Sequence, residues 1–138
     1  MRSSVYTTLV LLLACALQAC GSSPTMPSPT LSGAWQGTIE SEGPGTIKLQ
    51  LTESGVNVTG TVSLSQDGIV DAPGTFVGTL NSASVPTSMQ YTVTYTYGFD
   101  CHGSFSGTMT LTPSRMDGTY TGANCVRPFT GSLSATRQ

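Results

Sequence analysis

The residues that could do nucleophilic or metal chemistry in this chain are few. The sequence has one histidine, His102, directly after Cys101. A thiolate with an imidazole base is a nucleophile pair, but neighbours on a strand point to opposite faces, so a turn would have to bring the two together. Residues 103–107 have the spacing of a Gly-x-Ser-x-Gly nucleophile elbow but carry Phe105 at its centre. With one histidine and few cysteines, no zinc site can be completed. We therefore expect no enzyme and no cofactor.

An aromatic stripe is the second chemical feature. Within residues 88–99 every second residue is apolar, namely Met89, Tyr91, Val93, Tyr95, Tyr97 and Phe99. The residues between them are Gln90, Thr92, Thr94, Thr96 and Gly98. Such a face could wall an apolar pocket and offer hydroxyl groups to a ligand. The candidate ligand-facing residues are Trp35, Tyr91, Tyr95, Tyr97 and Phe99; ordinary core packing is the alternative.

The composition indicates which elements must position these residues. Charged residues make up 9% of the 138, and the net charge is −2, so there is no basic surface for nucleic acid. Gly, Thr and Ser are abundant, whereas Lys, Glu and Ala are scarce. This bias favours strands and turns over helices. We expect an all-β protein without a nucleic-acid partner.

A short template, apolar-x-Gly-Thr/Ser-apolar, recurs along the chain. Its copies are Trp35–Ile39, Val58–Val62, Phe76–Leu80, Phe105–Met109, Met116–Tyr120 and Phe129–Leu133. On a strand the glycine shares a face with the two apolar residues, and the Thr or Ser lies on the other face. The template predicts half-buried antiparallel strands with a notched apolar face and a hydroxyl-rich outer face.

Turn signals divide residues 31–138 into eight candidate strands. These are 31–41, 45–53, 56–65, 74–81, 88–99, 103–112, 115–122 and 128–137. A closed up-and-down barrel leaves no open sheet edge, and inward glycines let strands coil sharply. We predict a single small antiparallel up-and-down β-barrel of about eight strands; a β-sandwich is the alternative.

In an up-and-down barrel alternate turns lie at opposite ends. One end, here called the base, collects the turns near residues 54, 84 and 114 and the C-terminus. The other, the distal end, collects residues 42–45, 66–73, 100–103 and 123–127. Acidic residues gather at the distal end, namely Glu40, Glu42, Asp67, Asp71 and Asp100. Carboxylates can hold calcium, which makes Asp67, Asp71 and Asp100 weak calcium candidates, although solvated turn acids are the alternative and we expect no other metal.

The first residues look like a targeting segment. Arg2 is followed by an apolar run over residues 5–17 that is short for a membrane span. The run ends in Leu17-Gln18-Ala19-Cys20, which resembles the lipobox of bacterial lipoproteins. The resemblance implies a cleaved signal peptide over residues 1–19 and acylation of Cys20. An ordinary signal peptide and a second box at Leu12-Leu13-Ala14-Cys15 are alternatives.

The same resemblance implies where the protein resides. Acyl chains, palmitate among them, would anchor it in the membrane of the bacterial cell envelope, and Gly21 after the cysteine implies the outer membrane. Residues 20–30 are rich in Pro and Ser and are expected to form a flexible tether. An exported domain folds in an oxidising compartment. We therefore predict a disulfide between Cys101 and Cys125, with a reactive thiol beside His102 as the alternative.

Gly33-Ala34-Trp35 resembles the Gly-x-Trp of the calycin barrels, the lipocalin and avidin relatives. In those families an Arg near the last strand packs across the Trp and closes the base of the barrel. Arg137 is in phase with Leu133 and Ala135, so it would point inward at the end where Trp35 lies. The resemblance implies a calycin-like barrel closed by Trp35 and Arg137; a core Trp and a frayed terminal Arg are the alternative.

Two classes of function fit these features. The first is a non-catalytic binding module for a small apolar or amphipathic ligand, with the distal end as its mouth. The second is a structural or interaction lipoprotein with a filled barrel, whose partner is an envelope protein or a glycan. A cavity favours the first, and a solid interior with exposed aromatic residues favours the second.

Overall fold

The computed structural model describes residues 30–66, 68–82, 84 and 87–138. The regular elements of these residues are all strands. None of them belongs to a helix long and apolar enough to cross a membrane. The predicted signal peptide, Cys20 and nearly all of the tether lie outside the described residues.

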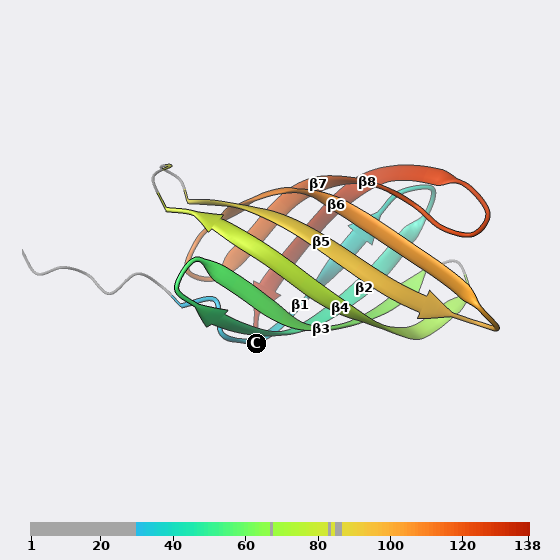
Figure 1. Ribbon diagram of the computed structural model, residues 1–138, viewed down its shortest axis with the longest axis horizontal. Helices are drawn as coiled ribbons and strands as arrows, with labels where there is room; N and C mark the ends of the chain where they lie inside the picture. The colour runs from blue at the N-terminus through green and yellow to red at the C-terminus, as the bar shows by residue number, and fades with distance from the viewer. Residues whose placement is uncertain (1–29, 67, 83, 85–86) are drawn as a thin grey trace, which may run out of the picture.

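Eight antiparallel strands close into one barrel in chain order, as Figure 1 shows. The strands are β1 (Gly33–Glu40), β2 (Pro44–Ser54), β3 (Asn57–Gln66), β4 (Ile69–Asn81), β5 (Ser88–Tyr97), β6 (Cys101–Leu111), β7 (Arg115–Ala123) and β8 (Pro128–Arg137). Each strand pairs with its neighbour in sequence, and β8 pairs with β1. The predicted up-and-down barrel is confirmed, and the sandwich alternative is wrong.

Strand β4 begins earlier than its turn-forming residues predict. Pro73 still pairs with Ser63, and the register shifts between Leu64 and Gln66. Asp71 adopts a positive φ of 48°, a conformation that aspartate tolerates better than most residues. A β-bulge of this kind interrupts the regular pairing locally, and the strand continues beyond it.

Strand β5 ends two residues earlier than predicted. Gly98 and Asp100 adopt φ values of 59° and 61°, which make a tight turn, and Tyr97 pairs directly with Cys101. Phe99 therefore lies at the tip of the turn, fully exposed at 104%. The prediction that Phe99 shares the inward face of this strand is wrong, because the alternation stops where the strand stops.

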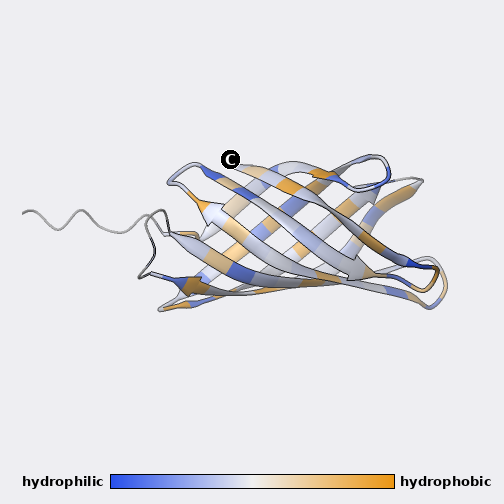
Figure 2. Ribbon diagram, turned by 90° about the horizontal axis from the view of Figure 1, so that it is seen from above, coloured by the Kyte–Doolittle hydropathy of each residue, from blue (hydrophilic) through white to orange (hydrophobic). Residues whose placement is uncertain are grey.

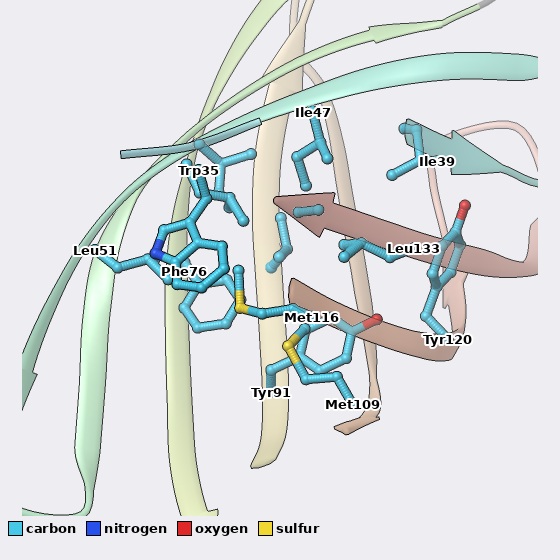
Figure 3. Packing of buried hydrophobic residues seen from close by; sticks show 14 of the residues in the cluster. Trp35, Ile39, Ile47, Leu51, Phe76, Tyr91, Met109, Met116, Tyr120 and Leu133 are labelled. Carbon is cyan, nitrogen blue, oxygen red and sulfur yellow. The ribbon is translucent and has the colours of Figure 1, made fainter. Parts of the chain in front are cut away.

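The interior is apolar throughout. Hydropathy alternates along the strands (Figure 2), and among the described residues no buried side chain is polar or charged. The half of the barrel nearer the base is filled by large side chains that are at most 1% exposed, among them Trp35, Phe76, Met89, Met109 and Met116. Figure 3 shows Trp35 and Phe76 packed together with Leu51, and Met116 beside Met109 and Tyr91.

The space that a side chain would take at an inward glycine is filled by atoms of neighbouring residues. A Cβ at Gly37 would collide with the Ser134 backbone of β8, so the glycine permits close approach of two strands. A Cβ at Gly103 would instead meet the ring of Tyr95, its partner across β5 and β6. The glycines therefore serve both strand coiling and the placement of aromatic rings.

Candidate functional site at the distal end

A cavity of about 300 Å³ opens at the distal end. This volume is at the lower limit of cavities that hold drug-sized ligands. Seven strands and two distal connections line it: Ile39, Ser41, Glu42, Leu64, Gln66, Ile69, Tyr95, Tyr97, Phe105, Tyr120, Asn124, Val126, Arg127 and Phe129. The barrel is thus filled at its base and hollow at its mouth.

Aromatic rings from β5 to β8 form one wall of the cavity. Tyr95 and Tyr97 stack with their ring centres 6.0 Å apart and their planes 17° apart. Phe105 packs on Tyr120 at 4.6 Å between ring centres, and Tyr120 meets Phe129 edge-on at 6.1 Å. Aliphatic side chains of β1, β3 and β4 form the facing wall: Ile39, Leu64 and Ile69.

Glycines hold two of these rings in place. Tyr95 lies across from Gly103 and Tyr120 across from Gly131. A Cβ at Gly131 would collide first with the backbone carbonyl oxygen of Glu40 and would lie 2.5 Å from the Tyr120 hydroxyl oxygen. A side chain at Gly103 would therefore displace the Tyr95 ring, whereas one at Gly131 would meet the β1 backbone as well as the Tyr120 ring.

Two tyrosines of the cavity wall, Tyr95 and Tyr120, hold their hydroxyl protons more strongly than an exposed tyrosine does. Burial raises the pKa of Tyr95, the neighbouring Tyr97 raises it further, and a hydrogen bond with Asn124 opposes the shift. Burial also raises the pKa of Tyr120, with Ser41 opposing. The Tyr120 hydroxyl donates to the Glu40 carbonyl oxygen at 3.3 Å.

Polar contacts hold the β1–β2 turn (residues 41–43) in place at the mouth. The Gln66 amide donates from Nε2 to the Gly43 carbonyl oxygen at 2.6 Å and to the Ser41 hydroxyl at 3.2 Å. Arg127 of the β7–β8 loop (residues 124–127) forms an exposed ion pair with Glu42. These contacts fix the positions of polar groups at the opening.

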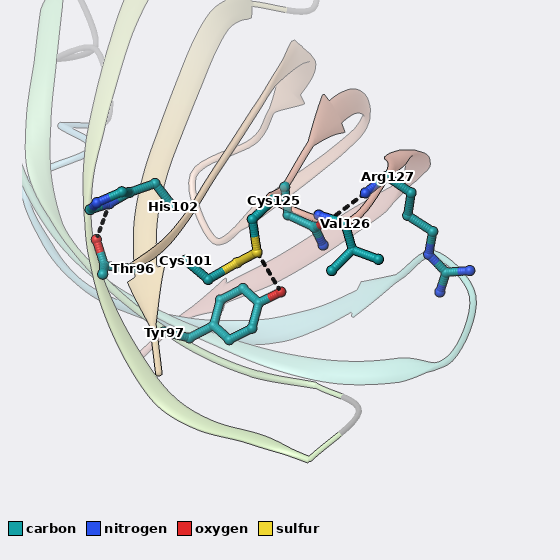
Figure 4. The surroundings of a disulfide bond; sticks show 8 residues. Thr96, Tyr97, Cys101, His102, Cys125, Val126 and Arg127 are labelled. Atoms are coloured by element: carbon teal, nitrogen blue, oxygen red, sulfur yellow. Dashed lines mark hydrogen bonds between the residues drawn. A yellow bond between two sulfur atoms is a disulfide. The ribbon is translucent and has the colours of Figure 1, made fainter. Parts of the chain in front are cut away.

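The predicted disulfide between Cys101 and Cys125 is present, with 5.5 Å between the two Cα atoms. It ties the β7–β8 loop to the first residue of β6, and the Tyr97 hydroxyl lies 3.8 Å from Cys125 Sγ (Figure 4). Within the loop, the Asn124 side chain accepts hydrogen bonds from the amides of Val126 and Arg127. The β7–β8 loop, which supplies three cavity residues, is therefore fixed both by the disulfide to β6 and by hydrogen bonds within the loop.

The alternative pairing of Cys101 with His102 is not formed. His102 lies on the outer face, where Nδ1 is 2.9 Å from the Thr96 hydroxyl. Figure 4 shows its ring turned away from the disulfide. Cys101 is bonded to Cys125, so neither a free thiol nor an adjacent base exists at this position.

The five candidate ligand-facing residues separate into three groups. Tyr95 and Tyr97 line the cavity. Trp35 and Tyr91, 1% and 3% exposed, are core residues below it. Phe99 projects outward from its turn. Trp35, Tyr91 and Phe99 are therefore not cavity residues, contrary to the prediction. For Trp35 and Tyr91 the reason is that inward orientation alone does not distinguish the hollow half of the barrel from the filled half.

Three aromatic residues of the cavity wall were not predicted from the sequence. They are Phe105, Tyr120 and Phe129. Each is the distal apolar residue of a template copy, so template phase combined with the position of the distal end could have found them.

The two calcium candidates among the described residues, Asp71 and Asp100, are not assembled into a site. Asp71 lies 3.8 Å from Lys48 Nζ and accepts a hydrogen bond from the Ser63 hydroxyl. Asp100 lies in the β5–β6 turn, and Asp67 is outside the described residues. Across the described ranges, no group of three or more His, Cys, Asp or Glu side chains could hold a metal ion.

At the base, Arg137 lies over Trp35. The guanidinium carbon is 4.7 Å from the centre of the indole ring, and the two residues are partners across β1 and β8. Arg137 also donates to the carbonyl oxygens of Ser32 and Thr30. Arg137 thus points inward at the end where Trp35 lies, as the phase of the last strand predicts, and it makes the contact with Trp35 that the Gly-x-Trp resemblance implied.

Comparison with known proteins gives no match: no family model fits the chain, and neither a curated protein nor a solved structure is significantly similar to it.

Proposed function

We propose that this protein is a non-catalytic binding module for a small apolar or amphipathic molecule, held in the bacterial cell envelope by a lipid anchor. The cavity of about 300 Å³ at the distal end carries the proposal. Its walls are apolar and its rim is polar, the combination typical of small-molecule sites.

The construction of the mouth supports a preformed site. The Cys101–Cys125 disulfide fixes the β7–β8 loop, and Gln66 fixes the β1–β2 turn. A ligand would then bind without the cost of ordering these segments.

The anchor rests on the sequence before the barrel. Leu17-Gln18-Ala19-Cys20 resembles a lipobox, and two acyl chains hold a protein stably to a bilayer where one does not. The start of β1 and the C-terminus lie at the base, so an anchor at Cys20 would leave the mouth facing away from its attachment. A Cys20→Ser variant should leave the membrane fraction if the anchor exists, and its retention there would contradict it.

The binding proposal is tested by native mass spectrometry of protein purified from cells without denaturant. The matched variants are Ile69→Trp, which fills the mouth, and Val70→Trp, whose side chain points outward and is 77% exposed in the native residue. We expect a removable added mass on the native protein and on Val70→Trp, but not on Ile69→Trp. An added mass that all three carry equally would place the ligand elsewhere and contradict the proposal.

A second candidate is an interaction lipoprotein that docks through its distal end. Three of the most exposed large apolar side chains lie there, at the start of β4, in the β5–β6 turn and in the β7–β8 loop: Val70, Phe99 and Val126, at 77%, 104% and 75%. Exposed apolar side chains at one end are a feature of protein contact surfaces. Photo-crosslinking from position 99 should then capture an envelope partner, whereas a matched probe at position 104 on the outer wall should not.

A further inference from the structure

The cavity indicates the class of ligand as well as its presence. Resting on the proposed function, we propose that the site takes an uncharged, flat aromatic compound of one or two fused rings that carries a hydroxyl or amine group, in preference to a lipid with a long alkyl chain.

The depth of the cavity is the first argument. On β5 it reaches from Tyr97 to Tyr95, two residues, or about 7 Å along a strand. Tyr91 lies two inward-facing positions beyond Tyr95 on β5, toward the base. It is 3% exposed and packs on Phe76 with ring centres 5.8 Å apart. This closed floor stops a long chain, whose remainder would stay in water and lose its hydrophobic gain.

The shape of the walls is the second argument. Five aromatic rings face a wall of aliphatic side chains. The stacked pair Tyr95 and Tyr97 and the edge of Phe129 present the faces and edges that aromatic ligands pack against. A flat ring fills a wide, shallow space of this kind better than a flexible chain does, and it loses less conformational entropy.

The polar groups around the opening favour an uncharged ligand with a hydrogen-bonding group. The Tyr95 hydroxyl lies beside Asn124, and the Tyr120 hydroxyl lies beside Ser41. Together these groups provide hydrogen-bond donors and acceptors for a ligand. Arg127, the cation that lines the cavity, is already paired with Glu42. A carboxylate would have to displace Glu42 from Arg127, and an anion left unpaired near Glu42 would be repelled.

The test compares three probes by calorimetry on the purified full-length protein: naphthol, naphthoate and dodecanol. Naphthol and naphthoate differ in charge, and naphthol and dodecanol share a hydroxyl but differ in shape. We expect one naphthol site that binds about tenfold more tightly than either other probe. Ile69→Trp should lose this binding, and Val70→Trp should keep it.

A second variant covers the case in which Ile69→Trp does not fold. Replacing Tyr95 and Tyr120 together by Phe keeps both rings and removes only the hydroxyl groups. Loss of hydrogen bonds to the ligand should weaken naphthol about tenfold. Unchanged naphthol affinity would overturn the role given to these hydroxyls.

The outcomes separate the inference from the proposed function. If dodecanol or naphthoate binds as tightly as naphthol and is lost in Ile69→Trp, the ligand class is wrong while binding at the mouth stands. If no probe saturates a site, or if Ile69→Trp binds every probe as the native protein does, both are overturned.

Discussion

Arg137 lies over the indole of Trp35 at 4.7 Å and closes the base of the barrel where its last strand meets its first. The same guanidinium donates to the Ser32 carbonyl oxygen at 2.9 Å. One side chain therefore joins the C-terminal strand, the core tryptophan and the segment entering β1. The base is closed by these contacts, while the opposite end remains open.

Removing this guanidinium should destabilise the barrel measurably. We expect Arg137→Gln to lower the free energy of unfolding by about 1–2 kcal/mol, since it loses a cation–π contact and hydrogen bonds to carbonyl oxygens. Urea denaturation followed by Trp35 fluorescence measures the change. Arg115→Gln, which breaks an exposed pair with Asp117, is the control and should leave the midpoint unchanged. Equal effects in the two variants would contradict the role of Arg137.

The disulfide should stabilise both the fold and the mouth. Closing a loop with a sequence separation of 24 residues predicts a loss of about 3 kcal/mol when Cys101 and Cys125 are both replaced by Ser. Hydrogen exchange should also accelerate at the amides of Val126 and Arg127, which the loop holds. Exchange at Met109, far along β6, serves as the internal reference. Uniform acceleration would show that the bridge has no local effect on the mouth.

Two glycine substitutions should differ because of what faces each residue. Gly37→Ala places a methyl group against the Ser134 backbone, which cannot move without separating β1 from β8. We expect a loss of about 3 kcal/mol or failure to fold. In Gly103→Ala the atoms nearest to the new methyl group belong to the end of the Tyr95 side chain, which can move, so the change should cost about 1 kcal/mol. Urea midpoints of the two variants decide the matter, and equal costs would contradict this explanation of the notches.

Stability should fall in alkali because of the enclosed tyrosines. Burial raises the pKa of Tyr91, Tyr95 and Tyr120 above the ordinary value of 10.0. Below about pH 10 both folded and unfolded chains keep these protons, so this contribution to stability is fully present. Above it the unfolded chain releases protons that the folded protein retains, and stability falls as pH rises. Urea midpoints across this range should drop less in Tyr91→Phe than in the native protein, and identical slopes would contradict the assignment.

The sequence predicted the barrel because its local signals agree with one another. The template places glycine, apolar and hydroxyl residues with period two, and the turns divide the chain into eight strands that close in order. The same phase correctly placed Arg137 on the inward face at the end where Trp35 lies. Periodicity is a property of neighbouring residues, so it is readable without the fold.

The cavity could not be predicted in the same way. Tyr91 and Tyr95 are equivalent in the pattern of β5, yet one is core and the other lines the mouth. The difference depends on which side chains of distant strands fill the interior at each level. The prediction for Phe99 was wrong for a local reason, since the positive φ of Gly98 ends the alternation of β5 before Phe99. Glycine can adopt a positive φ but does not have to, so the residue type alone does not show where the strand ends.

An NMR titration with naphthol would show whether a ligand binds at the mouth of the barrel, above the filled base. We expect the aromatic signals of Tyr95, Tyr120 and Phe129 to shift to saturation. The indole N–H of Trp35, bonded to the Leu31 carbonyl oxygen at the base, should not shift. Shifts confined to Trp35 or to the outer wall, or no shift at the mouth up to the solubility limit of the probe, would contradict binding at the mouth.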